Sequence, residues 1–335
     1  MKVLEVSSHS GISLKNILFA TDFSEASEAA VSYAAAICHQ YGSQLHVIHT
    51  VSPASYIVPT APDGPVTMES MYDLACADAR QRMQTLSSHL KVVPHHTYVR
   101  EGELWDGIAE MIRTHAIDLV IVGTRGRTGV EKLVLGSKAE EVLRRATCPV
   151  LTVGPKISGR SKLPAVEGEG KGLTPVDISV RQIVYATDFS PESLAGAPFA
   201  TSLAQQFQAK LTLLHVIEKI EDTGRRPSSI DLALQRLEKL VPEEARLWCS
   251  PKPSVQLGPS ADCILQEALN SKADLIVLGV RVAAGHLGAA THLPWTTAHK
   301  VIAQAHCPVL TIPFTAALQA KKERDGFYEF GGMIP

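Results

Sequence analysis

Short apolar runs alternate along this chain with longer stretches in which apolar residues recur at helical spacing. The run NILFAT (16–21) is bounded by polar residues, as is typical of a strand buried on both faces. The next stretch, 25–41, has apolar side chains at helical spacing, and Ser24 stands where a residue caps a first turn. The pattern therefore predicts a strand followed by a helix.

The same alternation continues to about residue 153. It predicts strands over 44–51, 95–101, 118–123 and 149–153, and helices over 68–91, 103–115 and 138–146. Alternating strands and helices favour parallel strands joined by right-handed helical crossovers. We therefore expect the α/β class, with an open, doubly wound sheet.

The chain also repeats itself. The second half answers KNILFATDFSEAS (15–27) with RQIVYATDFSPES (181–193), and AIDLVIVGTRG (116–126) with KADLIVLGVRV (272–282). ATCPVLTV (146–153) likewise answers AHCPVLTI (305–312). Matches in the same order at nearly constant spacing indicate a tandem duplication. We expect a first domain over 12–155, a linker over 156–179 that is rich in Gly, Pro, Lys and Glu, a second domain over 180–314, and a tail over 315–335.

Composition adds few constraints. Of the 335 residues, 45% are hydrophobic and 20% charged, and the net charge is −2, which describes an ordinary soluble protein. This balance gives no reason to expect nucleic acid or a membrane as partner. No signal-peptide core or membrane-length apolar run stands out, and the cysteines are scattered. We therefore expect a cytoplasmic protein with reduced thiols.

A candidate ligand site follows from the fold class. In open parallel sheets, ligands bind beyond the carboxyl ends of the strands, where the strand order reverses. Asp22 follows the first strand and Gly123 follows the fourth. Gly123 is the first residue of the spacing G-x2-G-x9-G-S, which continues with Gly126, Gly136 and Ser137. Glycine-rich turns and helix N-termini favour anions, so a phosphate suits this stretch. Two structural alternatives stay open, namely glycines as turn residues and Asp22 as a cap or turn residue.

With ATDFS in both halves, the glycine signature and CPVL, the sequence resembles the universal stress protein family (UspA-like), in its tandem form. The resemblance covers both copies. It implies two Rossmann-like domains, each a five-stranded parallel sheet of order 3-2-1-4-5 flanked by helices. It also implies an adenine nucleotide as ligand, ATP in the nucleotide-binding branch, with Mg²⁺ or Mn²⁺ bridging the phosphates.

The resemblance also implies which residues bind the nucleotide in the first domain. The residues after the first strand would border the adenosine, Thr50 would offer backbone atoms to the adenine, and the end of the fourth strand would lie near the ribose. The glycine turn and the start of the next helix would hold the phosphates, with arginine charge nearby. The residues concerned are Ala20, Thr21, Asp22, Thr50, Val122, Gly123, Arg125, Gly126, Gly136, Ser137 and Lys138.

The second copy departs from this pattern. Val282 stands at the position of Gly126, while Trp295 and Thr296 stand at those of Gly136 and Ser137. Bulky side chains at positions of close approach would block an anion. We therefore predict that the second domain has lost phosphate binding and acts as a structural or regulatory partner.

No catalytic residue and no metal site built by protein ligands is assigned. His49 and His215 end equivalent strands, so a shared packing or hydrogen-bonding role is expected. The resemblance implies that the last strands pair, giving an intramolecular pseudo-dimer, and it leaves a homodimer and an unknown protein partner open. The favoured interpretation is a stress-response regulator with at most slow ATPase or self-phosphorylation activity. The alternatives are a nucleotide-free scaffold and an adenylating enzyme of related fold.

Overall fold

The computed structural model describes residues 12–52, 68–91, 93–124, 135–154, 157, 178, 180–218, 226–243, 246, 249–281 and 296–314. The chain divides into two compact units. The first unit holds Leu14–Ser179 and Leu287–Thr311, and the second unit holds Met1–Ser13, Val180–His286 and Ile312–Pro335. The linker, apart from residues 157 and 178, and the tail lie outside the described residues, so the predicted domain limits stay predictions.

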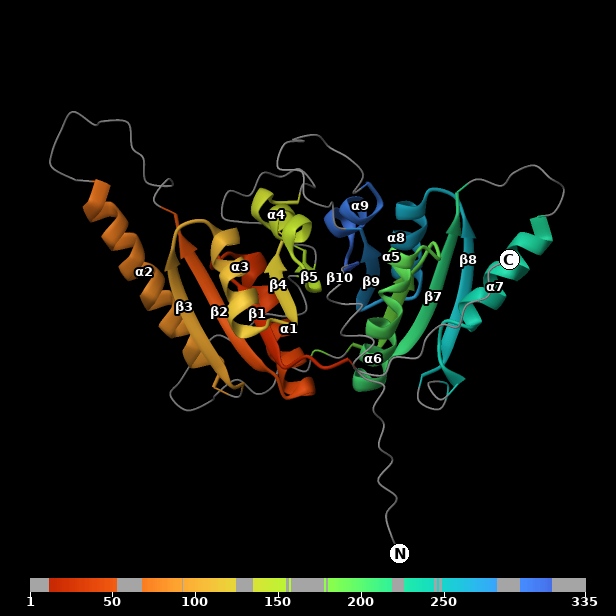
Figure 1. Cartoon of the computed structure of the whole chain (residues 1–335), viewed down its shortest axis with the longest axis horizontal. Coiled ribbons are helices and arrows are strands. Elements are labelled where there is room, and N and C mark those ends of the chain that lie inside the picture. Colours follow the sequence, from red (N-terminus) through yellow and green to blue (C-terminus); the bar gives the residue numbers. More distant parts are fainter. Residues whose placement is uncertain are drawn as a thin grey trace, which may run out of the picture. The chain divides into compact units, whose positions relative to one another are not determined.

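The first unit is built on a mostly parallel sheet in which the strands run β3-β2-β1-β4-β5 (Figure 1). Its strands are β1 (Asn16–Ala20), β2 (Gln44–Val51), β3 (His95–Glu101), β4 (Leu119–Gly123) and β5 (Val150–Val153). Its helices are α1 (Glu25–Tyr41), α2 (Met68–His89), α3 (Leu104–His115), α4 (Ser137–Arg145) and α9 (Thr296–Gln304). Val309–Thr311 of β10 (Val309–Pro313) pair antiparallel with β5 in this unit.

The second unit repeats the arrangement with the order β9-β6-β7-β8. Its strands are β6 (Gln182–Ala186), β7 (Lys210–Ile217), β8 (Pro251–Leu257) and β9 (Leu275–Val280). Its helices are α5 (Pro191–Leu194), α6 (Ala197–Phe207), α7 (Arg226–Glu238) and α8 (Ser260–Asn270). Next to β9, the N–H of Phe314 donates to the carbonyl of Val280 at 3.0 Å. The α/β class with a mostly parallel sheet is thereby confirmed.

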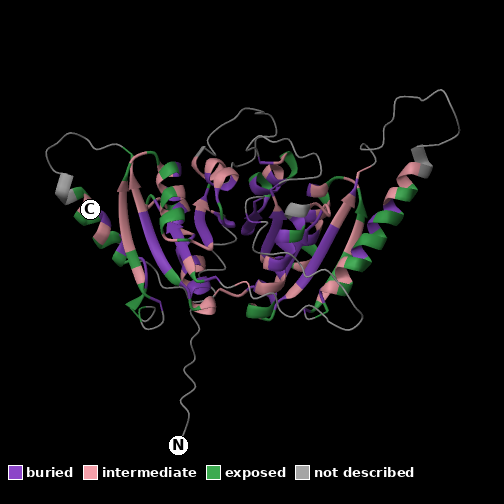
Figure 2. Cartoon of the chain, turned by 180° about the vertical axis from the view of Figure 1, so that it is seen from behind, coloured by how far each residue is buried: buried purple, intermediate pink, exposed green. Residues whose placement is uncertain are grey.

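The apolar runs of the sequence become the buried strands. Along β1, Ile17, Leu18 and Phe19 are fully buried, and Ile183, Val184 and Tyr185 are fully buried along β6. Figure 2 shows buried residues concentrated on the strands, with exposed residues gathered on the helices. Strands covered on both faces need apolar residues at every position, which is why these runs do not alternate.

The predicted helix starts are also confirmed. The Ser24 hydroxyl accepts a hydrogen bond from the N–H of Ser27, and Ser190 does the same for Ser193. Pro191 occupies the first turn of α5, where its missing N–H removes no helical hydrogen bond. Among the described residues, none of the helices is both long and apolar enough to cross a membrane.

One helix differs between the repeats. The helix after the first strand is continuous in the first repeat (α1) but is split into α5 and α6 in the second. Tyr185, which stands where the first repeat has Phe19, donates its buried hydroxyl to the carbonyl of Ser193 at 2.8 Å. That carbonyl also accepts from the N–H of Gly196 at 3.1 Å, three residues later, and not from the fourth residue as in a regular α-helix. The hydroxyl that Tyr185 has and Phe19 lacks is therefore bonded at the point where the helix is split.

Candidate functional site

The candidate site begins at the carboxyl ends of β1 and β4, which are neighbours in the sheet. Ala20 lies opposite Val122 on one side and opposite Ile48 of β2 on the other. After β1 the chain crosses to β2 on one side, and after β4 it crosses to β5 on the other side, so the strand order reverses between β1 and β4. We call the ends of β1, β2 and β4 with the starts of α3 and α4 the rim; parallel sheets bind ligands at such a place.

The turn after β1 is held by its own side chains. The Oγ1 atom of Thr21 accepts from the N–H of Phe23 at 3.0 Å and from the hydroxyl of Ser27 at 2.8 Å. The Oδ1 atom of Asp22 accepts from the N–H of Ser24 at 3.0 Å. Phe23 has a φ of 57°, the left-handed conformation that such a tight turn requires. Asp22 therefore has a turn-forming role, which was one of the two structural alternatives.

A histidine on β2 supports this turn in each repeat. The Nδ1 atom of His49 lies 2.7 Å from the carbonyl oxygen of Thr21, and its ring centroid lies 4.5 Å from that of Phe23. In the second repeat, Nδ1 of His215 lies 2.8 Å from the carbonyl of Thr187, and its ring lies 4.5 Å from Phe189. The expected shared hydrogen-bonding role is confirmed.

The backbone N–H and carbonyl groups of Thr50 point to the same side of β2 as β1, beyond the point where β1 ends. The carbonyl of Ile48 accepts from the N–H of Thr21, so Ile48 faces β1, whereas the carbonyl of Val51 faces β3 and accepts from Gly102. Backbone groups alternate sides along a strand, so those of Thr50 point to the β1 side. Because β1 ends at Ala20, opposite Ile48, β1 does not continue beside them.

The start of α4 forms the other wall of the rim. Gly136 is the N-cap residue, in an extended conformation with no side-chain cap, and Ser137 is the first helical residue. The N–H of Gly136 is used, because it donates to the carbonyl of Thr124 at 2.9 Å. The N–H groups of Ser137 and the two residues that follow have no acceptor within the helix. Arg125 and Gly126 lie outside the described residues.

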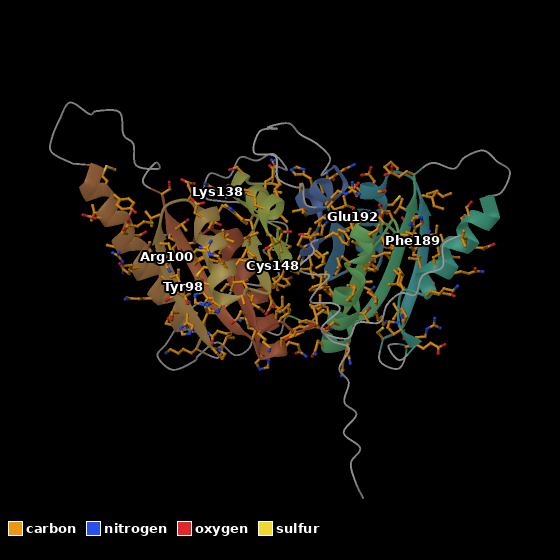
Figure 3. All side chains as sticks on the ribbon, viewed as in Figure 1. Tyr98, Arg100, Lys138, Cys148, Phe189 and Glu192 are labelled. Carbon is orange, nitrogen blue, oxygen red and sulfur yellow. The ribbon has the colours of Figure 1, made fainter. Side chains whose placement is uncertain are left out.

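The charged side chain of Lys138 is already paired. Its Nζ atom makes an ion pair with Glu103, whose other carboxylate oxygen accepts from the hydroxyl of Ser52 at 2.7 Å. The hydrogen bonds from Lys138 and Ser52 lower the pKa of Glu103, so it stays charged at neutral pH. Glu103 was not predicted from the sequence, where its one signal is an acidic residue just before the helix that starts at Leu104. Figure 3 shows Lys138 on α4.

Among its described residues, the rim offers N–H donors and the Lys138 side chain to an anionic ligand, together with backbone groups of β2 to a base. Within the described ranges, no group of three or more His, Cys, Asp or Glu residues could hold a metal ion. A divalent ion bridged by the ligand's own phosphates, as the resemblance implies, fits a rim at which the carboxylate of Glu103 already pairs with Lys138.

The second repeat keeps the turn, and its α5 packs against β9. Asp188 accepts from the N–H and the hydroxyl of Ser190, at 2.9 and 2.6 Å. A Cβ atom on Gly279 would lie 2.0 Å from the carbonyl oxygen of Glu192, so the first turn of α5 sits directly on this glycine. Arg281 then pairs with the Glu192 carboxylate at 2.6 Å. Val282, Trp295 and the side chain of Thr296 lie outside the described residues.

Comparison with known proteins agrees with the repeat. The family model described as "Universal stress protein family" matches residues 13–154 and 179–313. A universal stress protein of Thermus aquaticus is 35% identical over 138 residues, which is 39% of this chain and 98% of that protein. Universal stress protein MJ0531 of Methanocaldococcus jannaschii is 30% identical over 145 residues, which is 42% of this chain and 81% of that protein.

A solved structure matches both repeats at once. The crystal structure of a universal stress protein from Archaeoglobus fulgidus superposes with a TM-score of 0.65, covering 90% of this chain and 99% of that one, at 16% identity. At that identity the likeness speaks for the fold alone. Together with the two family matches along the sequence, these findings show that the chain belongs to the universal stress protein family, as a tandem of two repeats.

Proposed function

We propose that the first repeat binds ATP at the rim and that the protein is a nucleotide-dependent regulator of a stress response in the cytoplasm. The observation that carries the proposal is the start of α4 at the point where the strand order reverses. Its first turn supplies N–H donors and the positive end of the helix dipole, which favour a phosphate. Ser137 adds a hydroxyl donor at the same place.

The proposed binding mode assigns each wall of the rim to one part of the nucleotide. Ala20, Thr21 and Asp22 border the adenosine, and the outward backbone groups of Thr50 meet the adenine edge. Val122 and Gly123 lie near the ribose. The phosphates lie against Gly136, Ser137 and the Lys138 backbone, together with Arg125 and Gly126. Mg²⁺ or Mn²⁺ would neutralise charge on the phosphates, held mainly by them.

A regulatory role is proposed in preference to efficient catalysis. Phosphoryl transfer needs a residue that orients the attacking water or hydroxyl in line with the leaving group. Of the two carboxylates named at the rim, Asp22 holds the β1–α1 turn and Glu103 is paired with Lys138. Slow hydrolysis or self-phosphorylation is the most activity that such an arrangement supports.

We further propose that the second repeat binds no nucleotide. Its departures at Val282, Trp295 and Thr296 remove the glycine signature that the first repeat carries. The two repeats fit an intramolecular pseudo-dimer, in which the second acts as a structural or regulatory partner. A homodimer or a separate protein partner would add to this arrangement.

Isothermal titration calorimetry with ATP and magnesium tests the proposal. The wild type is compared with the Gly126→Val/Gly136→Trp double variant, which copies the second repeat, and with Ser137→Ala, which removes only a hydroxyl. Thr296→Ala, at the equivalent position of the second repeat, is the matched control. We expect one site per chain, lost in the double variant, weakened by Ser137→Ala and unaffected by Thr296→Ala.

Each other outcome points elsewhere. Two sites per chain would contradict the loss of binding in the second repeat. No heat at millimolar ATP, with circular dichroism showing folded protein, would refute nucleotide binding and favour a scaffold that acts through its interfaces. Release of pyrophosphate in the presence of a carboxylate substrate would favour an adenylating enzyme instead. Titrations with ADP, AMP and a cyclic nucleotide establish the preferred ligand.

A further inference from the structure

A buried histidine lies at the end of the first repeat's sheet that is opposite to the rim. His46, near the start of β2, is only 3% exposed. Its Nδ1 atom lies 3.3 Å from the hydroxyl of Tyr98 on β3, and its Nε2 atom lies 3.3 Å from Oδ1 of Asn16 on β1. An amide oxygen can only accept, so a neutral ring protonated on Nε2 satisfies both contacts.

Two more histidines surround this ring. The ring centroid of His115, in the last turn of α3, lies 4.6 Å from that of His46, and the centroid of His96 on β3 lies 5.9 Å away. The ring centroids of Tyr98 and His115 lie 5.7 Å apart, so the side chains from β2, β3 and α3 form one group. We call Asn16, His46, His96, Tyr98 and His115 the histidine cluster.

The cluster faces α3 and not α2. Alternate residues of a strand share a face, and a Cβ atom on Gly107 of α3 would lie 3.0 Å from Ile48, two residues after His46. On the opposite face, Val51 packs with Cys76 and Ala79 of α2. The cluster therefore joins the C-terminal end of α3 to the sheet.

Charged side chains lie near the cluster on β3, on α3 and just after α3. On β3, the Arg100 guanidinium lies 6.0 Å from the ring of Tyr98, and on α3 Glu110 pairs with Arg100 at 3.6 Å (Figure 3 shows Tyr98 and Arg100). Beyond α3, the Asp118 carboxylate accepts from the N–H groups of Lys15 and Asn16. The two ring nitrogens of His46 face neutral groups, the hydroxyl of Tyr98 and the amide oxygen of Asn16.

The second repeat lacks the cluster. The residues at the positions of His46, His96, Tyr98 and His115 are Thr212, Lys252, Ser254 and Ser271. Gln182 stands in place of Asn16, and its Nε2 atom donates to the hydroxyl of Thr212 at 2.9 Å. The same fold therefore forms with an uncharged pair here, so the histidines are not required to build it.

We propose that the histidine cluster is an acid-sensitive latch, which holds α3 to the sheet of the first repeat at neutral pH and releases it when His46 becomes protonated. His115 and His96 lie beside the ring of His46, so a positive charge on that ring is repelled by both. Protonation of His46 leaves Nε2 a donor to Asn16 but turns Nδ1 from an acceptor into a donor, so the hydroxyl of Tyr98 can no longer donate to it. This inference does not depend on nucleotide binding.

Burial, followed by repulsion from His115 and His96, lowers the pKa of His46 from 6.5 to about 4. Because the folded pKa lies below the unfolded value, the open form takes up the proton first as the pH falls. The stabilisation is therefore complete above pH 6.5 and is lost as the pH falls toward 4. Between pH 7 and pH 5, linkage gives an increase of about 20-fold in the opening equilibrium from His46 alone.

Hydrogen exchange followed by mass spectrometry, corrected for the pH dependence of chemical exchange, tests the latch on the full chain. We expect opening of α3 and β1–β3 to increase about 20-fold from pH 7 to pH 5, whereas α8 and β6–β8 of the second repeat serve as an internal control and change little. The Asn16→Gln/His46→Thr double variant copies the Gln182–Thr212 pair and should abolish the increase. His115→Ser, copying Ser271, should reduce it.

Two results would overturn the proposal. One is an equal pH response in the two repeats; the other is an unchanged response of α3 in the double variant. If that variant does not fold, the ring of His46 is titrated directly by nuclear magnetic resonance in the wild type and in His115→Ser. A pKa of 6 or more for His46 in the wild type, or the same pKa in both proteins, would also refute the latch.

Discussion

Gly279 is kept in a repeat that we propose binds no phosphate, and the structure supplies a reason. A Cβ atom at this position would lie 2.0 Å from the carbonyl oxygen of Glu192 and 2.6 Å from Cα of Ser193. Both are backbone atoms, so no side-chain rotation can relieve the clash. We therefore predict that Gly279→Ala forces α5 away from β9, or β9 out of its place beside β6.

The size of the effect follows from what that movement breaks. Restoring a tolerable contact requires a displacement of about 1 Å. Ser193 accepts from the buried hydroxyl of Tyr185 and bonds to Thr187, each at 2.8 Å, and neither bond survives such a shift unchanged. Two hydrogen bonds at about 1 kcal/mol each, with about 1–3 kcal/mol for overpacking, give a total of roughly 3–5 kcal/mol.

Hydrogen exchange measures this locally, which matters because a two-unit chain need not unfold in one step. We expect the opening equilibrium of β6 and β9 in Gly279→Ala to increase about 100-fold or more, since each 1.4 kcal/mol is tenfold. Gly107→Ala in α3 is the control. Its Cβ atom would meet only the ends of the Ile48 and Thr50 side chains, at 3.0 and 3.2 Å, and it gains about 1 kcal/mol of helix propensity.

Wild-type exchange of β6 and β9 in Gly279→Ala would refute the packing explanation, and a ligand would then be the better reason for a glycine there. The outcome bears on the first repeat as well. Gly123 stands at the equivalent position, so its assignment to the ribose competes with the same packing requirement. Loss of ATP binding in Gly123→Ala alone would therefore not locate the nucleotide.

Two further predictions follow from single contacts. Tyr185→Phe copies Phe19 of the first repeat and removes the hydroxyl that donates to Ser193; thermal denaturation should show a loss of about 1 kcal/mol, because the Ser193 carbonyl keeps its bond from Gly196. An unchanged midpoint would mean that this hydrogen bond contributes nothing. Glu103→Gln removes a carboxylate that competes with phosphate for Lys138, so calorimetry should show ATP binding several-fold tighter and adenosine binding unchanged. Weaker ATP binding would instead indicate that Glu103 helps to hold the ligand.

Much of the fold could be predicted from the sequence, because its signals are local. The apolar runs at 16–21 and 118–123 reflect strands covered on both faces, and Ser24 and the Ser190–Pro191 pair mark helix starts within a few residues. Internal repetition then doubled every such signal. The shared role of His49 and His215 could be predicted for the same reason, since equivalent positions in two copies of one fold meet equivalent neighbours.

The candidate site was only partly predictable. The order of strands brings Ala20 beside Val122, as the family resemblance implied. The pairing of Lys138 with Glu103 did not, because 35 residues separate them and only the packing of α3 against α4 brings them together. The turn-forming bonds of Asp22 likewise depend on the exact backbone path after β1.

The tertiary structure alone decided where single side chains meet over long separations. His46, Tyr98 and His115 lie far apart in the sequence, and no local periodicity relates them; parallel pairing of β2 with β3 and the return of α3 place them together. In the sequence, Gly279 resembles part of a ligand-binding signature, whereas in the structure the carbonyl of Glu192 leaves no room for a Cβ atom there. Local patterns record the preferences of a few adjacent residues, whereas contacts such as these arise only when separate elements are packed against one another.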